Sequence, residues 1–292
     1  MMREYLQRKI ELVNKELDSI YLEQDALNST LVKSMNYSLM AGGKRLRPVL
    51  LMAAADAVGA NGENFVHLAT SIEMIHTYSL IHDDLPAMDN DDYRRGKLTN
   101  HKVFGDGVAV LAGDALLTMA FEVIADSPNV DVAKKLKIVK EISHAAGPEG
   151  MVGGQVIDLE SEGKHIDMNT LQKMHRAKTG ALFCAAIRSG AILGDATDKQ
   201  LEALTEYARQ FGLAFQITDD ILDVTGDEAS IGKPVGSDEK NHKSTYVTLG
   251  SLQSAKDLAQ KAVDNAKEAL KDFGTEADFL REIVDYLISR KK

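Results

Sequence analysis

Carboxylates crowd into a short segment that follows an apolar stretch in the first third of the chain. Residues 82–92 read His-Asp-Asp-Leu-Pro-Ala-Met-Asp-Asn-Asp-Asp. Like charges at this density repel one another unless cations neutralise them, and oxygen-only ligands suit hard divalent ions. Asp83 and Asp89 are out of register on an ideal helix, so we expect Pro86 to break the helix and bring Asp89 back toward Asp83. Taken alone, a solvated acidic helix end is the simpler interpretation.

A second acidic segment favours a metal site over a solvated helix end. Residues 215–223 read Phe-Gln-Ile-Thr-Asp-Asp-Ile-Leu-Asp, which places Asp219 and Asp223 one turn apart on one helix face, with Asp220 alongside. The flanking residues are apolar, so this acidic face borders a core or a cavity. Two aspartate-rich helix ends could clamp metal ions between them.

Basic residues accompany the acidic segments. An anionic ligand of a chain whose net charge is −10 needs local positive groups, because the overall charge repels it. Guanidinium forks match phosphate oxygens in pairs, and lysines act on them as point charges. Alongside two acidic segments, the following basic groups favour a diphosphate site over a solvated surface: Lys44-Arg45-Leu46-Arg47, Arg94-Arg95-Gly96-Lys97, Lys178-Thr179 and Gly232-Lys233.

Composition excludes several other classes of protein. A pI near 5.3 argues against a nucleic-acid binder. The chain shows no unbroken apolar run near the ~18 residues of a membrane span, and its charged N-terminus lacks a secretory signal, so we expect no membrane anchor. The single cysteine, Cys184, fits a reducing compartment and hence a cytoplasmic location, and we expect it to be a buried core thiol. The Gly42-Gly43-Lys44 turn lacks Walker A spacing, and the histidines lack zinc-like spacing.

Helical patterns dominate the chain. Abundant Ala, Leu, Glu and Lys, few prolines and a three-and-four spacing of apolar residues predict about ten or more helices. No linker or repeat divides the chain, so we expect one all-α domain over residues 1–292. The clearest predicted helices span residues 1–27, 65–82, 132–145, 201–224 and 252–273.

In this order and spacing, the segments resemble the trans-prenyltransferases, and most closely the bacterial-type farnesyl diphosphate synthases. The resemblance runs from about Met40 to Tyr246 and includes residues 42–48, 76–89, 94–96, 113–114, 154–159, 178–179, 215–223 and 232–238. It implies an all-helical, single-domain bundle around a deep central cavity, usually a homodimer. The implied reaction is head-to-tail condensation of dimethylallyl or geranyl diphosphate with isopentenyl diphosphate, releasing pyrophosphate and giving mainly farnesyl diphosphate.

The resemblance also implies roles for residues. Two or three Mg²⁺ ions, with Mn²⁺ as a possible replacement, would neutralise the departing pyrophosphate, and the bound pyrophosphate itself would accept the final proton. Thr179 and Gln216 would face the developing cation. Arg94, Lys178 and Lys233 would bind the leaving group, the last from a lid at residues 226–241. A metal-free pocket for isopentenyl diphosphate would be formed by Lys44, Arg47, His76 and Arg95, and the metals would be held by Asp83, Asp84, Asp89, Asp219, Asp220 and Asp223.

Product length is expected to depend on Tyr78 and its neighbour Ser79. Tyr78 precedes Asp83 by five residues, about 7.5 Å along a helix axis, so a tail growing down this helix would meet its ring. In the family, this aromatic residue together with Pro86 and Ala87 in the acidic motif implies a fifteen-carbon product. The alternative is that Tyr78 only packs in the core.

Other functions stay open at this point. A geranylgeranyl diphosphate synthase would share every metal ligand and differ at the cavity floor. A class I terpene cyclase normally carries Asn, Ser or Thr and Glu in its second motif, whereas this chain has Asp-Asp-x-x-Asp at residues 219–223. A non-catalytic subunit of a prenyl synthase would have lost motif residues, and this chain retains them.

Overall fold

The computed structural model describes residues 2–20, 28–226 and 244–290. Almost every element in this part of the chain is helical. The α-helices are α1 (Met2–Ser19), α2 (Ser29–Leu39), α3 (Leu46–Ala57), α4 (Val66–Asp83), α5 (Asn100–Phe104), α6 (Asp106–Asp126), α7 (Val132–Ala146), α8 (Met151–Ser161), α9 (Met168–His175), α10 (Ala181–Leu193), α11 (Asp198–Thr225), α14 (Tyr246–Leu249), α15 (Leu252–Ala269) and α16 (Asp278–Ser289).

Three short helical elements and one hairpin complete the described chain. Two 3₁₀ turns are η1 (Gly62–Phe65) and η3 (Thr275–Ala277), and a π-helical turn, η2 (Arg176–Gly180), joins α9 to α10. The antiparallel hairpin pairs β1 (Tyr93–Arg94) with β2 (Lys97–Leu98). The all-α expectation is therefore confirmed, although it did not include the hairpin.

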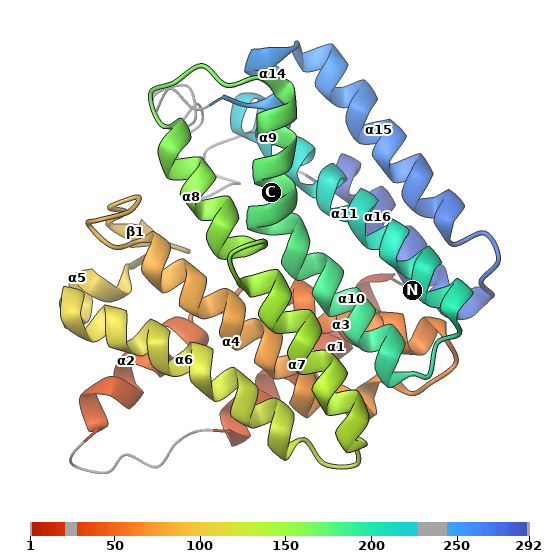
Figure 1. Ribbon diagram of the computed structural model, residues 1–292, viewed down its shortest axis with the longest axis horizontal. Coiled ribbons are helices and arrows are strands. Elements are labelled where there is room, and N and C mark those ends of the chain that lie inside the picture. Colours follow the sequence, from red (N-terminus) through yellow and green to blue (C-terminus); the bar gives the residue numbers. More distant parts are fainter. Residues whose placement is uncertain (1, 21–27, 227–243, 291–292) are drawn as a thin grey trace.

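The long helices pack side by side around α4, α10 and α11, which cross the middle of the molecule (Figure 1). The helix α6 packs against α4 on one side, and α15 lies along α11 on the other. An apolar core extends through these helices, with Leu50, Ile72, Leu116, Phe183 and Phe211 fully buried.

Local signals fix where the helices begin. Thr197 and Gln200 form a capping box at the start of α11, in which each side chain receives a backbone N–H of the other residue. The Asp131 carboxylate accepts backbone N–H bonds at the start of α7. The predicted helices at residues 65–82, 132–145, 201–224 and 252–273 are confirmed with small shifts at their ends, whereas the first helix ends at Ser19 and residues 21–27 lie outside the described part.

The expectation of no membrane anchor stays a prediction. Within the described residues, α6 is long and apolar enough to cross a membrane by length and composition alone, because Asp114 and Glu122 interrupt its apolar run without making it polar on average. Because α6 packs against α2, α4 and α5, its apolar character also serves the core.

A buried ion pair ties the turn before α3 to α4. Arg45 Nη1 donates to Glu73 Oε1 at 2.7 Å, and both side chains are almost fully buried. The same guanidinium donates to the Leu39 carbonyl and to the Asn14 side chain. Arg45 is therefore a structural residue, in contrast to its neighbours in the basic segment, and it holds the segment at residues 44–47 against α4.

The substitution Glu73→Ala is expected to lower the free energy of unfolding by about 3–5 kcal/mol, because it leaves a buried guanidinium without its counter-charge. Equilibrium urea unfolding would measure this. The matched control Glu268→Ala removes an exposed pair with Lys271, and its effect on stability should be far smaller. Equal losses in the two variants would contradict the structural role of the Arg45–Glu73 pair.

Candidate active site

The first acidic motif turns back on itself at the end of α4. The helix ends at Asp83, and the Asp89 backbone N–H donates to the Asp83 carbonyl at 2.9 Å. Asn90 donates to the Leu85 carbonyl and adopts a positive φ of 52°, a conformation that asparagine tolerates well. The expected break at Pro86 and the return of Asp89 to Asp83 are confirmed.

The hairpin after this motif places an arginine on it. Arg95 and Gly96 both have positive φ angles, as a two-residue type I′ turn requires. The turn directs Arg94 to Asp84, whose two oxygens accept from Arg94 Nε at 2.7 and 2.9 Å. Asp84 is buried, and in this structure its carboxylate holds the arginine.

Asp83 carries the least compensated charge of the motif. Burial, followed by repulsion from Asp89, raises the pKa of Asp83 to about 6, although Lys178 and Arg94 pull it down. The carboxylate thus lies near a lysine of the π-helical turn and an arginine of the hairpin, and their positive charge does not fully offset its burial. An added cation beside Asp83 and Asp89 would remove the remaining penalty.

The π-helical turn η2 supplies the lysine. Lys178 Nζ donates to Asp158 Oδ2, on α8, at 2.7 Å. The two backbones approach closely at Gly154, where a Cβ atom would lie 2.2 Å from the Lys178 nitrogen. Only glycine fits at this position, so α8 positions the turn that carries Lys178 and Thr179. A widened turn of this kind is frequent at functional sites.

The second acidic motif lies near the end of α11 and already contacts other groups. Asp219 Oδ1 accepts from Arg290 Nη2 at 2.5 Å, and the Arg290 guanidinium stacks on the Phe215 ring with its carbon 4.5 Å from the ring centroid. Asp220 is buried and accepts the Tyr246 backbone N–H at 2.8 Å, which caps α14. Asp223 is half-buried on the same helix.

The basic pocket forms where three segments meet. The Arg95 guanidinium donates to the Gly42 carbonyl. A Cβ atom on Gly43 would lie 2.6 Å from the carbon of this guanidinium, so the Gly-Gly turn has room for the arginine only because residue 43 is glycine. Arg47 stacks on Phe183, with its guanidinium carbon 4.4 Å from the ring centroid. Lys44 is exposed at the rim.

Electrostatics link this pocket to both acidic motifs. Burial lowers the pKa of Arg47 to about 10, and the charges of Glu73 and Asp219 act against that shift while Arg95 adds to it. Burial, followed by the charges of Arg47 and Arg95, lowers the pKa of His76 well below its usual range, so the imidazole is neutral at pH 7. Arg47 therefore lies within the fields of both Arg95 and Asp219.

The remaining predicted residues lie on α4, on η2 and on α11. Tyr78 is buried with its ring edge-on to His82, and burial followed by the Asp83 charge raises the pKa of Tyr78 to about 12. The Ser79 hydroxyl donates to the His76 carbonyl at 2.8 Å. Thr179 and Gln216 are both half-buried, on η2 and α11. Lys233 and most of the predicted lid lie outside the described residues.

The carboxylates of the first acidic motif fit Mg²⁺ by their chemistry. Asp83 and Asp89 offer oxygen atoms at a point of excess negative charge, and Mg²⁺ typically takes one or two carboxylates together with waters and substrate phosphates. In the described part of the chain, no three acidic, histidine or cysteine side chains converge into a complete cage. The donors therefore suit a metal that substrate helps to bind.

Two residues of this region were not assigned a role from the sequence. Asp158 lies within one of the matching segments, but its local pattern gives no sign of its pairing with Lys178. Arg290 lies 71 positions from Asp219 and near the C-terminus, where no pattern pointed to it. Cys184, expected in the core, is only partly buried.

Comparisons with known proteins agree with this geometry. The model of the polyprenyl synthetase family matches residues 28–287. The chain is 47% identical to the farnesyl diphosphate synthase of Bacillus subtilis over 274 residues, 93% of each chain. It is 45% identical to that of Micrococcus luteus over 292 residues, the whole of both chains. The crystal structure of an FPP/GFPP synthase from Zymomonas mobilis superposes with a TM-score of 0.89 at 38% identity, covering 98% of each chain.

A family match over nearly the whole chain, together with relatives of this identity, settles the class. The chain belongs to the polyprenyl synthetase family.

In metal-free protein, Asp83→Asn is expected to raise the free energy of unfolding at pH 7.5 but not at pH 4. The folded-state pKa of about 6 lies above the ordinary value of 3.8 for an exposed aspartate, so the folded state binds more protons between these two pH values and its stability falls as pH rises through this window. Urea unfolding in EDTA at several pH values measures the difference. A gain at pH 4 as large as at pH 7.5 would contradict the raised pKa.

Proposed function

We propose that this chain is a farnesyl diphosphate synthase, a prenyltransferase that joins an allylic diphosphate to isopentenyl diphosphate and releases pyrophosphate. The observation that carries this function is that Lys178 and Arg94 lie near Asp83, Arg47 lies near Asp219, and the charges of Arg94 and Arg95 connect the two groups. Near-full-length identity to bacterial farnesyl diphosphate synthases supports the substrates and the product.

Two carboxylates of each acidic motif are the first candidates for metal ligands. Asp83 and Asp89 would hold Mg²⁺ from α4, and Asp219 with Asp223 would do so from α11. Bound Mg²⁺ would supply positive charge to the pyrophosphate as the allylic C–O bond breaks. Asp84 and Asp220 belong to the predicted ligand set as well, and their contacts with Arg94 and Tyr246 give them a positioning role in this structure.

Fixed cations of the chain would stabilise the same leaving group. Arg94 is held by Asp84 and Lys178 by Asp158, so both charges are in place before the substrate binds. Lys233 would add a third cation. Arg290 occupies the Asp219 carboxylate and would have to share it when metal binds there.

Isopentenyl diphosphate would bind in the basic pocket. Arg47 and Arg95 remain charged at neutral pH and offer paired N–H donors to its phosphates, with Lys44 at the rim. The neutral His76 would donate a hydrogen bond without adding charge. This substrate keeps its diphosphate, so it needs tight binding but no help in bond breaking.

The carbon chemistry would take place between these two diphosphate sites. The Thr179 hydroxyl and the Gln216 amide oxygen would direct their dipoles at the allylic cation, which a stronger nucleophile would trap. The double bond of isopentenyl diphosphate attacks this cation, a C–C bond forms, and the released pyrophosphate takes the proton.

The direct test of this function is a product assay. The purified chain is incubated with dimethylallyl or geranyl diphosphate, labelled isopentenyl diphosphate and Mg²⁺, and the labelled product is sized by chromatography after phosphatase treatment. A fifteen-carbon alcohol is expected from both starters. Absence of any chain elongation, with and without Mn²⁺ in place of Mg²⁺, would refute the proposal, and a twenty-carbon product would indicate a geranylgeranyl diphosphate synthase instead.

Replacing Arg47 is expected to separate the two substrate sites. Arg47→Gln removes a charged pair of donors from the basic pocket, so the KM for isopentenyl diphosphate should rise about 10–100-fold while the KM for geranyl diphosphate changes little. Steady-state kinetics with each substrate varied in turn provide the measurement. The exposed Arg3→Gln variant serves as the charge-matched control. A larger effect on geranyl diphosphate would reverse the assignment.

Tyr78 is expected to limit product length. Its buried ring lies on α4 five residues before Asp83, where it would block a lengthening tail. Tyr78→Ala should shift the main product to twenty carbons or more, whereas Tyr78→Phe keeps the ring and should keep the fifteen-carbon product. Product sizing distinguishes them. A fifteen-carbon product from Tyr78→Ala would mean that Tyr78 only packs in the core and that Ser79 or another residue sets the limit.

Assembly and location follow from the surface and the composition. The α6 side chains of Val110 and Leu111, together with Val103 of α5, are exposed apolar groups, which suits an interface with a second copy in a homodimer. The lone cysteine supports a cytoplasmic location, and the acidic pI argues against a nucleic-acid partner. The continuous core supports a single domain over residues 1–292.

A further inference from the structure

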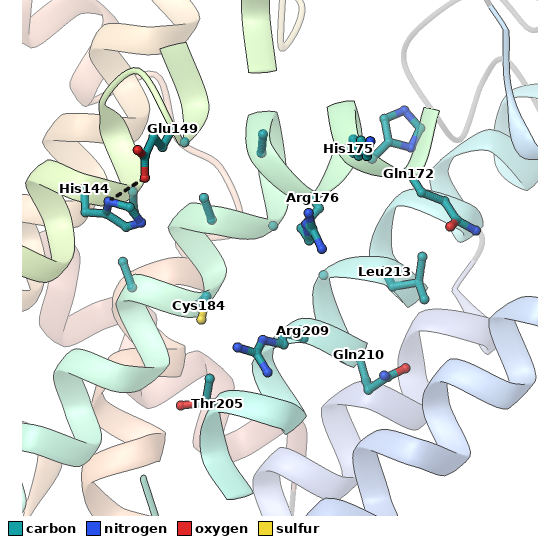
Figure 2. Close-up of a pocket in the computed structure, with 18 of the residues that line it drawn as sticks. His144, Glu149, Gln172, His175, Arg176, Cys184, Thr205, Arg209, Gln210 and Leu213 are labelled. Atoms are coloured by element: carbon teal, nitrogen blue, oxygen red, sulfur yellow. Dashed lines mark ion pairs between the residues drawn. The ribbon is translucent and has the colours of Figure 1, made fainter. Parts of the chain in front are cut away.

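A groove of about 980 Å³ lies beside the π-helical turn, whose Ala177 and Gly180 line it while Lys178 does not. Its walls come mainly from α7, α9, α10 and α11, and no described residue assigned to substrate or metal lines it. Figure 2 shows His144, Arg176, Cys184 and Arg209 around this space. The groove is large enough for a small organic ligand.

Two arginines reach into the groove from opposite walls. Arg176 comes from η2 and Arg209 from α11, and Figure 2 shows both extending into the space between these helices. Arg176 has no ion-pair partner among the residues that the structure describes. The one ion pair of Arg209 with another described residue is a 3.5 Å contact with the half-buried Glu206.

The third arginine of the groove is already satisfied. Arg188 donates to both oxygens of Glu141 at 2.8 Å and to Thr205 at 2.7 Å. His144 also has a neighbouring partner, because Glu149 Oε2 lies 3.7 Å from its imidazole Nδ1. Among the described lining residues, Arg176, Lys173 and Arg209 supply the positive charge that faces a ligand, with Glu206 beside Arg209, and the two guanidinium groups favour an anionic group placed between them.

The rest of the lining suits an apolar body. Ile157, Ala177, Ala181 and Leu213 line the groove next to the arginines. Tyr246 lines it as well, and its buried hydroxyl has no hydrogen-bond partner in the described part of the chain. A buried hydroxyl left unpaired is costly, so a ligand that shifts Tyr246 enough to reach this hydroxyl would gain a hydrogen bond.

The groove shares its wall with the catalytic machinery. Ala177 and Gly180 line the groove, whereas Lys178 between them points to Asp158 and Asp83. Tyr246 lines the groove with its side chain, and its backbone N–H binds Asp220 of the second motif. A ligand that displaces this wall would therefore act on both acidic motifs.

We propose that this groove is a regulatory site for a small amphipathic anion, whose phosphate-type head binds between Arg176 and Arg209 and whose apolar body covers Ala181 and Leu213. Occupancy shifts the π-helical turn and lowers turnover without competing with either substrate. The effect on turnover rests on the proposed function, whereas binding does not.

Cys184 gives a readout of binding that is independent of catalysis, because it is the only cysteine in the chain and lines the groove. Its alkylation by iodoacetamide at pH 8.5 is followed by mass spectrometry with octyl phosphate as the probe. We expect octyl phosphate to slow alkylation about tenfold at saturation, and inorganic phosphate or octanol alone to have less effect.

Two variants test the assignment of the head group. Arg176→Gln and Arg209→Gln should each raise the octyl phosphate concentration needed for half-maximal protection of Cys184 about 10–100-fold. Arg3→Gln should leave this concentration unchanged. Protection that persists in both groove variants would show that the probe acts from the active site, and would overturn the proposal. So would alkylation that octyl phosphate never slows.

Two further results bear on the regulatory part and on rival occupants. Octyl phosphate should lower kcat in the wild-type chain, and should lower it less in Arg176→Gln. If the chain is an active synthase and octyl phosphate protects Cys184 but leaves kcat unchanged, the proposed effect of groove occupancy on turnover is wrong. If Cys184 becomes reactive only on dilution of the protein, a second copy of the chain covers the groove and the small-molecule site is refuted.

Discussion

Negative charge held beside an apolar core is the constraint on which this site depends. The carboxylates at the end of α4 and along the last turns of α11 repel one another, and the fold supplies cations to offset them. Asp84 pairs with Arg94, Asp158 with Lys178, and Asp219 with Arg290. Asp83 is the least compensated of these residues, since burial and Asp89 outweigh the attraction of Lys178. The uncompensated charge lies where the proposed reaction needs a divalent cation.

The cations are held by close backbone approaches rather than by long, flexible side chains alone. Gly154 lets α8 touch the π-helical turn, which puts Lys178 within reach of Asp158. Gly43 leaves room for the Arg95 guanidinium, and the type I′ turn at Arg95 and Gly96 sends the two arginines to different partners. Groups positioned before the substrate arrives need not reorganise as charge develops, which favours catalysis.

The π-helical turn joins two regions that differ in character. One side carries Lys178 toward the acidic motif, and the other side, with Arg176, faces a groove that the proposed reaction does not use. A turn that is wider than an α-helix holds its register through tertiary contacts, so a ligand on either side can bias it. Tyr246 provides a second link, because it lines the groove and caps its helix through Asp220.

The helical class, most of the long helices and the break at Pro86 follow from the sequence, because they depend on local periodicity and on the backbone chemistry of proline. The acidic and basic motifs could also be assigned, since metal and phosphate binding require particular side chains. The sequence left open what each aspartate contacts. Asp84 and Asp220 look the same as Asp83 and Asp219 in the motifs, yet in the structure the first two are buried against Arg94 and Tyr246.

The sequence by itself thus determined the elements and the kinds of side chain available for chemistry, because both are properties of neighbouring residues. Only the tertiary structure decided the pairings of Lys178 with Asp158 and of Arg290 with Asp219, and the groove beside the π-helical turn. These depend on how helices distant in the chain pack, and the packing is set by burial of the whole apolar core rather than by any local pattern.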